Sequence, residues 1–212
     1  MQIIPTILEK DFNRAKEKIL VVKDLVKWIQ IDVIDGFFTF GKTFELELIT
    51  KIEGVENLLW ETHLMVKEPI NWIEKSIFIN TSRIIGQVEM MSDREKFVKK
   101  VKDKGVEAGL AIDIGTDIGE IPEETDLVLL MGRKAGFESY PFEEVIYKRI
   151  RQLVKIRAKN KLDFKIGIDG GVNENNINKL EEAGAEIAYC GGAIFNGKVK
   201  DNLEKLNYVG KN

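Results

Sequence analysis

Polar side chains that can do acid–base or ligand chemistry directly follow short apolar segments of this chain. The clearest case is WIQIDVIDGFF (28–38), where Asp32 and Asp35 adjoin an apolar run. Burying a carboxylate is costly unless a partner compensates its charge. Asp32 therefore predicts a functional site at the end of this segment. Asp35 is expected to cap the turn before Gly36 and to line the site only secondarily.

The same placement recurs along the chain. Polar residues end or follow other apolar segments at Thr6, His63, Gln87, Glu89, Asp113 and Asp169. A single residue of this kind is often only a turn or cap residue. Likewise His63, the only histidine of the chain, would taken alone more often be structural. It is the shared placement that indicates a site.

Two glycine pairs point to an anion. IGIDGGVNENN (166–176) contains Gly170 and Gly171, and YCGGAIFNG (189–197) contains Gly191 and Gly192. Glycine lets the backbone approach a ligand, and a helix that begins behind it favours negative charge. One pair alone more simply serves a turn. Two pairs, after the last two apolar segments, predict a phosphate site.

Eight short apolar segments, separated by charged segments with helical spacing, would carry these residues. They are 2–8, 28–33, 58–66, 83–88, 106–112, 126–131, 164–168 and 186–190. Helices are expected over 93–104 and 143–159, and residues 197–212 predict a final amphipathic helix and a short tail. Eight strands alternating with eight helices favour an α/β fold of the (β/α)8 TIM barrel type over a doubly wound open sheet.

Composition narrows the class of protein. A chain of 212 residues with 44% hydrophobic residues and no linker predicts one domain over 1–212. Its 32 basic and 35 acidic residues are interspersed, which argues against nucleic acid or an anionic membrane as partner. No apolar run is long enough to cross a membrane, and Cys190 is the single cysteine. We expect a soluble protein of a reducing cytoplasm.

Seven segments, read in order, resemble the ribulose-phosphate 3-epimerase family. They are IIPTILEKDF (3–12), WIQIDVIDGFF (28–38), THLMVKEP (62–69), GVEAGLAID (105–113), DLVLLMGRKAGF (126–137), IDGGV (168–172) and AGAEIAYCGGAIF (183–195). Their colinearity over nearly the whole chain is far more specific than any one of them. Members of this family fold as a (β/α)8 barrel, so the resemblance implies the same fold for this chain.

The resemblance implies an epimerase of carbohydrate metabolism in the pentose phosphate pathway. It would invert C3 of a small phosphorylated ketose, such as D-ribulose 5-phosphate, through an enediolate. Asp32 and Asp169 match the acid–base pair. A divalent cation (Zn, Mn, Fe, Co or Mg) held by Asp32, His63 and Asp169 would stabilise the enediolate. The substrate-binding positions are Thr6, Met65, Met131, Gly136 and Ser139, and the phosphate-binding positions are Gly170, Gly171, Gly191 and Gly192.

Two glutamines depart from the family pattern. Gln30 stands where a second histidine ligand is expected, and Gln87 replaces another histidine. An amide oxygen can ligate hard cations but suits Zn²⁺ less well. Metal use, and activity with it, is therefore expected to depend on Gln30 as the fourth ligand. Alternatively Gln30 donates a hydrogen bond to the enediolate.

The phosphate loop after the sixth strand also departs from the family. AGFESYPF (135–142) has Glu138 and Ser139 in place of glycines. Ser139 could donate to a phosphate, whereas Glu138 would repel one. Lys42, Arg133 and Lys134 are expected on the same face, where they could offset that charge.

Three alternatives remain open. One is a catalytically silent barrel that binds phosphometabolites after losing its metal site, although the two retained aspartates argue against it. Another is a different phosphosugar isomerase. The third is the decarboxylase branch of the phosphate-binding barrels, which uses a lysine where this chain has Ile34. Related barrels often associate, so a homo-oligomer is compatible with all three.

Overall fold

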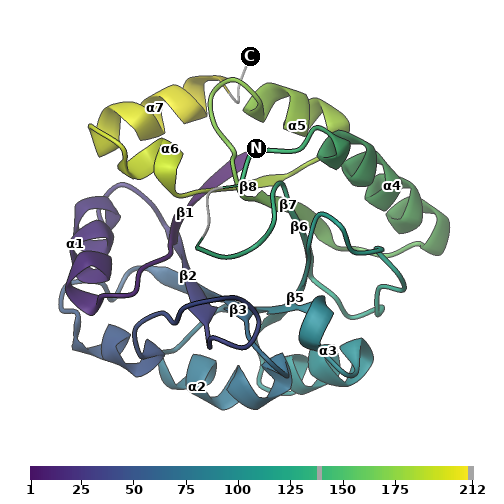
Figure 1. Cartoon of the computed structure of the whole chain (residues 1–212), viewed down its shortest axis with the longest axis horizontal. Helices are drawn as coiled ribbons and strands as arrows, with labels where there is room; N and C mark the ends of the chain where they lie inside the picture. Colours follow the sequence, from purple (N-terminus) through teal and green to yellow (C-terminus); the bar gives the residue numbers. More distant parts are fainter. Residues whose placement is uncertain (138–139, 210–212) are drawn as a thin grey trace.

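The structure is a computed structural model that describes residues 1–137 and 140–209. Eight parallel strands form a closed barrel in chain order, and β8 pairs back onto β1 (Figure 1). The strands are β1 Gln2–Ile7, β2 Trp28–Ile34, β3 Leu59–Met65, β4 Arg83–Gln87, β5 Glu107–Ile112, β6 Leu127–Met131, β7 Lys165–Asp169 and β8 Ile187–Cys190. The predicted (β/α)8 barrel is confirmed, and each predicted segment overlaps one strand.

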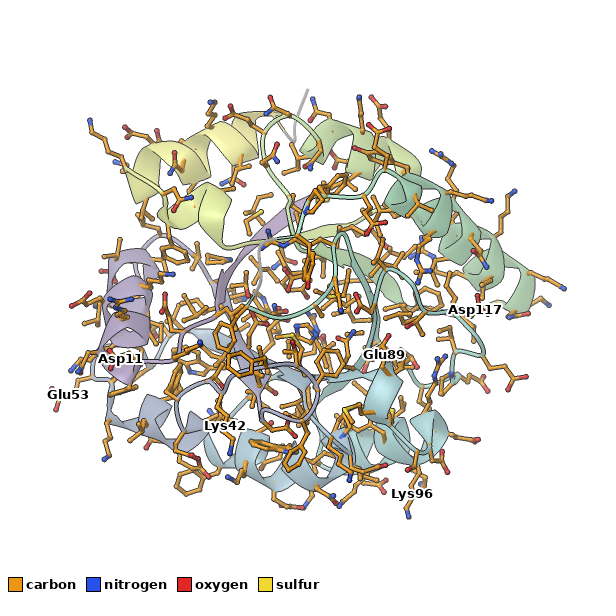
Figure 2. The ribbon with its side chains drawn as sticks, viewed as in Figure 1. Asp11, Lys42, Glu53, Glu89, Lys96 and Asp117 are labelled. Atoms are coloured by element: carbon orange, nitrogen blue, oxygen red, sulfur yellow. The ribbon has the colours of Figure 1, made fainter. Side chains whose placement is uncertain are left out.

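Helices surround the barrel (Figure 1). They are α1 Phe12–Val22, α2 Ile73–Phe78, α3 Arg94–Lys102, α4 Val145–Asn160, α5 Ile177–Ala183, α6 Gly192–Phe195 and α7 Val199–Val209, with the short 3₁₀ helices η1 Leu46–Lys51, η2 Pro69–Trp72 and η3 Val88–Met90. Charged side chains such as Glu53, Lys96 and Asp117 lie at the outer rim (Figure 2). Among the described residues no helix is both long and apolar enough to cross a membrane.

The expectation of one α-helix after every strand is wrong in two places. Only η1 lies between β2 and β3, and residues 113–126, between β5 and β6, form no helix. The second segment contains Gly115, Gly119 and Pro122, which disfavour a helix. Neighbouring helices hold it instead. Arg94 of α3 donates to the carbonyls of residues 118 and 120, and Arg149 of α4 donates to those of residues 113 and 116.

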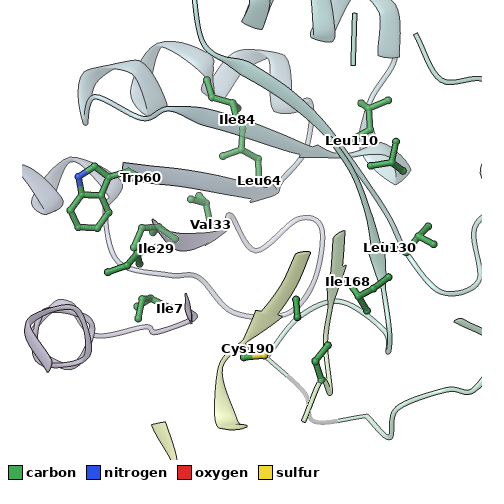
Figure 3. Packing of buried hydrophobic residues seen from close by; sticks show 14 of the residues in the cluster. Ile7, Ile29, Val33, Trp60, Leu64, Ile84, Leu110, Leu130, Ile168 and Cys190 are labelled. Atoms are coloured by element: carbon green, nitrogen blue, oxygen red, sulfur yellow. The ribbon is translucent and has the colours of Figure 1, made fainter. Parts of the chain in front are cut away.

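Strand alternation divides the apolar residues into two cores. In β2, Ile29, Ile31 and Val33 belong to the larger core, toward the surrounding helices. Figure 3 shows Ile29 and Val33 in this core. Ile34 faces the barrel interior, in the smaller core with Met65 and other inward side chains. Because side chains alternate along a strand, Gln30 and Asp32 share the inward face with Ile34. Gln30 and Asp32 of WIQIDVIDGFF therefore point into the barrel.

Below the site, a charged cluster crosses the barrel interior. Strand register aligns Arg83 with Glu61 on one side and with Glu107 on the other. Arg83 Nη1 lies 2.7 Å from Glu61 Oε2, and its guanidinium lies 4.7 Å from the centre of the Trp28 ring. Glu61 and Arg83 are buried. Since the cluster lies at the start of β4, it occupies the end of the barrel opposite to the carboxyl ends of the strands.

Candidate functional site

Two buried carboxylates face each other at the carboxyl end of the barrel. Asp32 is on β2 and Asp169 is the last residue of β7, and their side chains are almost excluded from solvent. Thr6 of β1 donates its hydroxyl hydrogen to Asp32 Oδ2 at 2.7 Å. Register places Thr6 beside Gln30, two residues before Asp32. Three strands thus build the site: β1 and β2, which are neighbours, and β7, which is separated from β1 by β8.

Gln30 links the two carboxylates. Its Nε2 lies 3.1 Å from Asp32 Oδ1, 2.8 Å from Asp169 Oδ2 and 3.0 Å from Thr6 Oγ1. Two N–H hydrogens thus serve three acceptors, and hydrogen bonds to ionised acceptors are the strong ones. Gln30 is fully buried, and its Oε1 has no hydrogen-bond partner among the described residues. The amide therefore holds the two carboxylates together.

His63 is the third member of the group. Register pairs it with Asp32, and its Nδ1 lies 3.0 Å from Asp32 Oδ1 and 3.8 Å from Asp169 Oδ2. Its Nε2 lies 2.8 Å from Gln87 Oε1. Because a carbonyl oxygen can only accept, Nε2 carries a hydrogen and donates to Gln87. Gln87 thereby orients the ring so that Nδ1 faces the two carboxylates.

The surroundings shift the pKa of two of these groups. Burial and the nearby charge of Asp32 raise the pKa of Asp169 to about 6. Burial lowers the pKa of His63, but the hydrogen bond with Asp32 and the charges of Asp32 and Asp169 outweigh it and raise that pKa to about 9. The group therefore contains a protonated imidazole and a carboxyl group that titrates near neutral pH, which suits acid–base chemistry.

The group fits a divalent cation. Asp32, His63 and Asp169 each offer a ligand atom, and these atoms lie within 4.8 Å of one another. The Nε2–H bond to Gln87 is the kind of contact that orients metal-ligating histidines, and Gln30 Oε1 is a buried oxygen with no hydrogen-bond partner among the described residues. The expectation that Gln30 and Gln87 compromise the site is not supported, because three ligands come together regardless.

A cavity of about 680 Å³ opens above the group. Its lining includes most of the residues that the sequence predicted for substrate and phosphate, namely Thr6, Asp32, Met65, Met131, Gly136, Asp169, Gly170, Gly171, Gly191 and Gly192. This volume is in the usual range for small-molecule sites. Gln30 and His63 are buried beneath it.

Other predicted residues lie elsewhere. Asp35 accepts from the backbone N–H groups of residues 37, 38 and 67, so it caps its turn as expected. However, it lines a separate groove of about 410 Å³ together with Lys42, which the sequence had placed with the cations of the site. Figure 2 shows Lys42 on the side of the barrel where α2 lies. Ser139 and Glu138 lie outside the described residues.

The phosphate prediction also assumed helices behind the glycine pairs. The structure has α5 and α6 there, but these are only seven and four residues long. Their macrodipoles are correspondingly small, because a macrodipole is a sum over aligned peptide units. A cationic side chain would therefore add to the weak positive potential of these short helices. Cys190 is buried, and burial raises the pKa of its thiol, so it is a packing residue.

Sequence reasoning missed several cavity residues. Lys18 of α1, Asn173, Tyr189 and Asn196 also line the cavity. Lys18 gave no signal, because a lysine in an amphipathic helix is normally a solvent-facing residue. The charged cluster of Glu61 and Arg83 was missed as well, although the strand register, had it been known, would have paired them.

Fold and site together define a (β/α)8 barrel with an acid–base group at the carboxyl ends of its strands. Orotidine 5′-phosphate decarboxylase from Pyrococcus horikoshii has the same fold, with a TM-score of 0.69, 16% identity and full coverage of both chains. The model of the ribulose-phosphate 3 epimerase family matches residues 2–195, and this chain belongs to that family.

Two relatives illustrate the distance within the family. Ribulose-phosphate 3-epimerase from Aquifex aeolicus is 30% identical over 200 residues, which cover 92% of this chain and 90% of the relative. The chloroplastic ribulose-5-phosphate-3-epimerase of Arabidopsis thaliana is 30% identical over 202 residues, which cover 92% and 72%. The resemblance of the seven sequence segments is confirmed.

Proposed function

We propose that this protein is an epimerase that inverts C3 of a ketose phosphate, such as D-ribulose 5-phosphate, giving D-xylulose 5-phosphate. One observation carries the proposal: two buried carboxylates from different strands, Asp32 and Asp169, are joined through the amide of Gln30 at the floor of the cavity. Family membership supports the same reaction. The C3 epimerisation needs one base and one acid within reach of a single carbon.

The proton steps balance as follows. The carboxylate of Asp32 removes the C3 proton and becomes neutral, while the electrons of the broken C–H bond form the enediolate across C2 and C3. Protonated Asp169 then delivers its proton to the opposite face of C3, becomes a carboxylate and leaves the inverted ketose. The reverse reaction exchanges the two roles. A pKa of about 6 gives Asp169 a protonated fraction near neutral pH.

Neighbouring residues support these steps. The Gln30 amide and the Thr6 hydroxyl hold the carboxylate of Asp32 in one orientation. His63 adds positive charge beside both aspartates, which favours negative charge developing on the substrate. Met65 and Met131 line the cavity with apolar side chains.

Asp32, His63 and Asp169 would hold a divalent cation, with Gln30 Oε1 as an additional oxygen donor. When bound, such a cation supplies positive charge to the enediolate oxygens. It would take the place of the His63 Nδ1 proton, because a ligating imidazole nitrogen must be unprotonated. Glycines 170, 171, 191 and 192 are proposed to receive the phosphate, since all four line the cavity and a glycine lets a ligand approach the backbone closely.

NMR of D-ribulose 5-phosphate in D₂O tests the proposal directly. The protein is expected to introduce deuterium at C3, with chelator or with added Mn²⁺, Zn²⁺ or Mg²⁺ showing the metal requirement. Asp32→Asn and Asp169→Asn should each abolish exchange. Asp35→Asn is the matched control, because Asp35 caps a turn and lines the separate groove. Exchange that persists in both site variants would refute the assignment, and binding without exchange would indicate a silent barrel.

A further inference from the structure

The cavity combines its two carboxylates with three cationic side chains. Lys18 comes from α1, and Arg133 and Lys134 come from the loop after β6. All three also interact with other groups of the protein. Lys18 Nζ lies 2.6 Å from Glu9 Oε1, and Lys134 Nζ lies 5.6 Å from the centre of the Tyr140 ring.

Arg133 is the cation that lies on a glycine pair. A Cβ atom added to Gly170 would lie 2.8 Å from Arg133 Cγ and 3.6 Å from its Nε. The side chain therefore crosses the Gly170 backbone at van der Waals distance, and the guanidinium group begins beside the glycines that face the cavity. Neither lysine is among the nearest neighbours of the four glycines.

The backbone before Arg133 is fixed relative to Asp169. The N–H of Gly132 donates to the carbonyl oxygen of Asp169 at 2.6 Å, and its own carbonyl accepts from the N–H of Glu143 at 2.9 Å. A Cβ on Gly132 would lie 2.5 Å from the carbonyl oxygen of Gly170. These close contacts hold the start of the Arg133 side chain at a set position from the carboxylate of Asp169.

We propose that Arg133 determines specificity at the phosphate end of the substrate, where its guanidinium group binds two phosphate oxygens above Gly170 and Gly171. The inference rests on the proposed function, which assigns the phosphate to these glycines. A guanidinium matches phosphate with two parallel N–H bonds, whereas an ammonium acts as a point charge. It also supplies the charge that the short helices α5 and α6 provide only weakly. Arg133 thus selects a phosphate monoester over a neutral sugar.

Titration calorimetry on the full chain, with chelator present, tests this role. The ligands are D-ribulose 5-phosphate, inorganic phosphate and unphosphorylated D-ribulose. Arg133→Met keeps the aliphatic stem on Gly170 and removes the charge. We expect it to weaken ribulose 5-phosphate binding by about 10- to 100-fold, the effect of losing hydrogen bonds to a charged group. The Arg133→Met variant should also bind inorganic phosphate more weakly than the wild type does, whereas its affinity for D-ribulose should be unchanged.

Two further variants sharpen the test. Arg133→Lys should recover only part of the affinity, because the two-pronged contact is lost. Lys134→Met removes one charge from the same loop and should weaken binding by less than about threefold, as expected of a solvated charge. Equal losses in Arg133→Met and Lys134→Met would overturn the proposal, as would unchanged affinity in Arg133→Met.

The design separates this inference from the proposed epimerase. If ribulose 5-phosphate binds and Arg133→Met weakens it while no deuterium enters at C3, the epimerase proposal fails and the role of Arg133 stands. If C3 exchange occurs and Arg133→Met leaves affinity unchanged, the role of Arg133 fails alone. A wild-type protein that binds neither phosphate ligand overturns both.

Discussion

Replacing Gln30 by leucine is expected to destabilise the protein in a pH-dependent way. In the wild type, Gln30 Nε2 lies 2.8 Å from Asp169 Oδ2 and 3.1 Å from Asp32 Oδ1, and all three residues are buried. Leucine fills similar space but donates nothing. Two buried carboxylates therefore lose their shared donor at the same time.

The size of the effect follows from these contacts. A hydrogen bond to a charged group contributes about 1.5–3 kcal/mol, so two such bonds give about 3–6 kcal/mol. Asp169 can relieve part of this loss by taking up a proton, because losing the Gln30 hydrogen bond removes a contact that lowers its pKa and so raises that pKa above about 6. A carboxyl group whose folded pKa lies above its unfolded value loses stability as pH rises. We therefore expect a deficit of about 3 kcal/mol or more at pH 8 and about half of that at pH 5.

Urea unfolding at pH 5 and pH 8, with chelator present, measures both values. Thr62→Val is the matched control. Thr62 lies in β3, and its hydroxyl is buried as the Gln30 amide is. Its hydrogen-bond partner, however, is the neutral hydroxyl of Ser76, at 3.1 Å. That variant should lose about 1 kcal/mol at either pH. The reasoning is refuted if the Gln30→Leu deficit is the same at both pH values or stays below about 1 kcal/mol at pH 8.

Three other predictions follow from single contacts. Gln30→His should bind Zn²⁺ more tightly in calorimetry, because it adds an imidazole beside the three ligands; unchanged affinity would place residue 30 outside the ligand shell. Burial raises the pKa of Glu61 to about 7, so the wild type should lose roughly 3 kcal/mol relative to Glu61→Gln between pH 4.5 and pH 8; parallel urea-unfolding profiles in chelator would contradict this. Gly132→Ala should cost about 2–4 kcal/mol in urea unfolding, because its methyl group would meet the Gly170 carbonyl. Gly115→Ala, with open space around it, should be nearly neutral, and an equal cost in both would count against the clash.

Much of the fold could be predicted because the strands are short, apolar and evenly spaced. Periodicity located all eight strands, since inward and outward residues of a barrel strand are both buried and leave a nearly continuous apolar run. The connections were harder. The segment 113–126 lacks a helix because Gly115, Gly119 and Pro122 disfavour one. Some of its carbonyls accept hydrogen bonds from Arg94 and Arg149, whose reach depends on the tertiary structure.

The site was predictable in part for a similar reason. Residues at strand ends converge in any closed barrel, so Asp32, His63 and Asp169 could be placed on one face from the order of strands alone. The role of Gln30 as the link between two carboxylates could not be predicted, because it depends on distances across the barrel. The position of Lys42 was wrong because Lys42 lines the separate groove, whereas Thr39 and Gly41 of the same loop lie next to Gly136 and Phe137.

The arginine contacts of the segment between β5 and β6 also affect local unfolding of this part of the barrel. A loop without secondary structure would ordinarily fluctuate independently and exchange its amide hydrogens quickly. Here the carbonyls of residues 113, 116, 118 and 120 bond to side chains of α3 and α4. Because the loop cannot detach without breaking bonds to both helices, these three segments form one cooperative unit. The barrel wall between β5 and β6 is thus closed by helices that belong to the connections on either side of it.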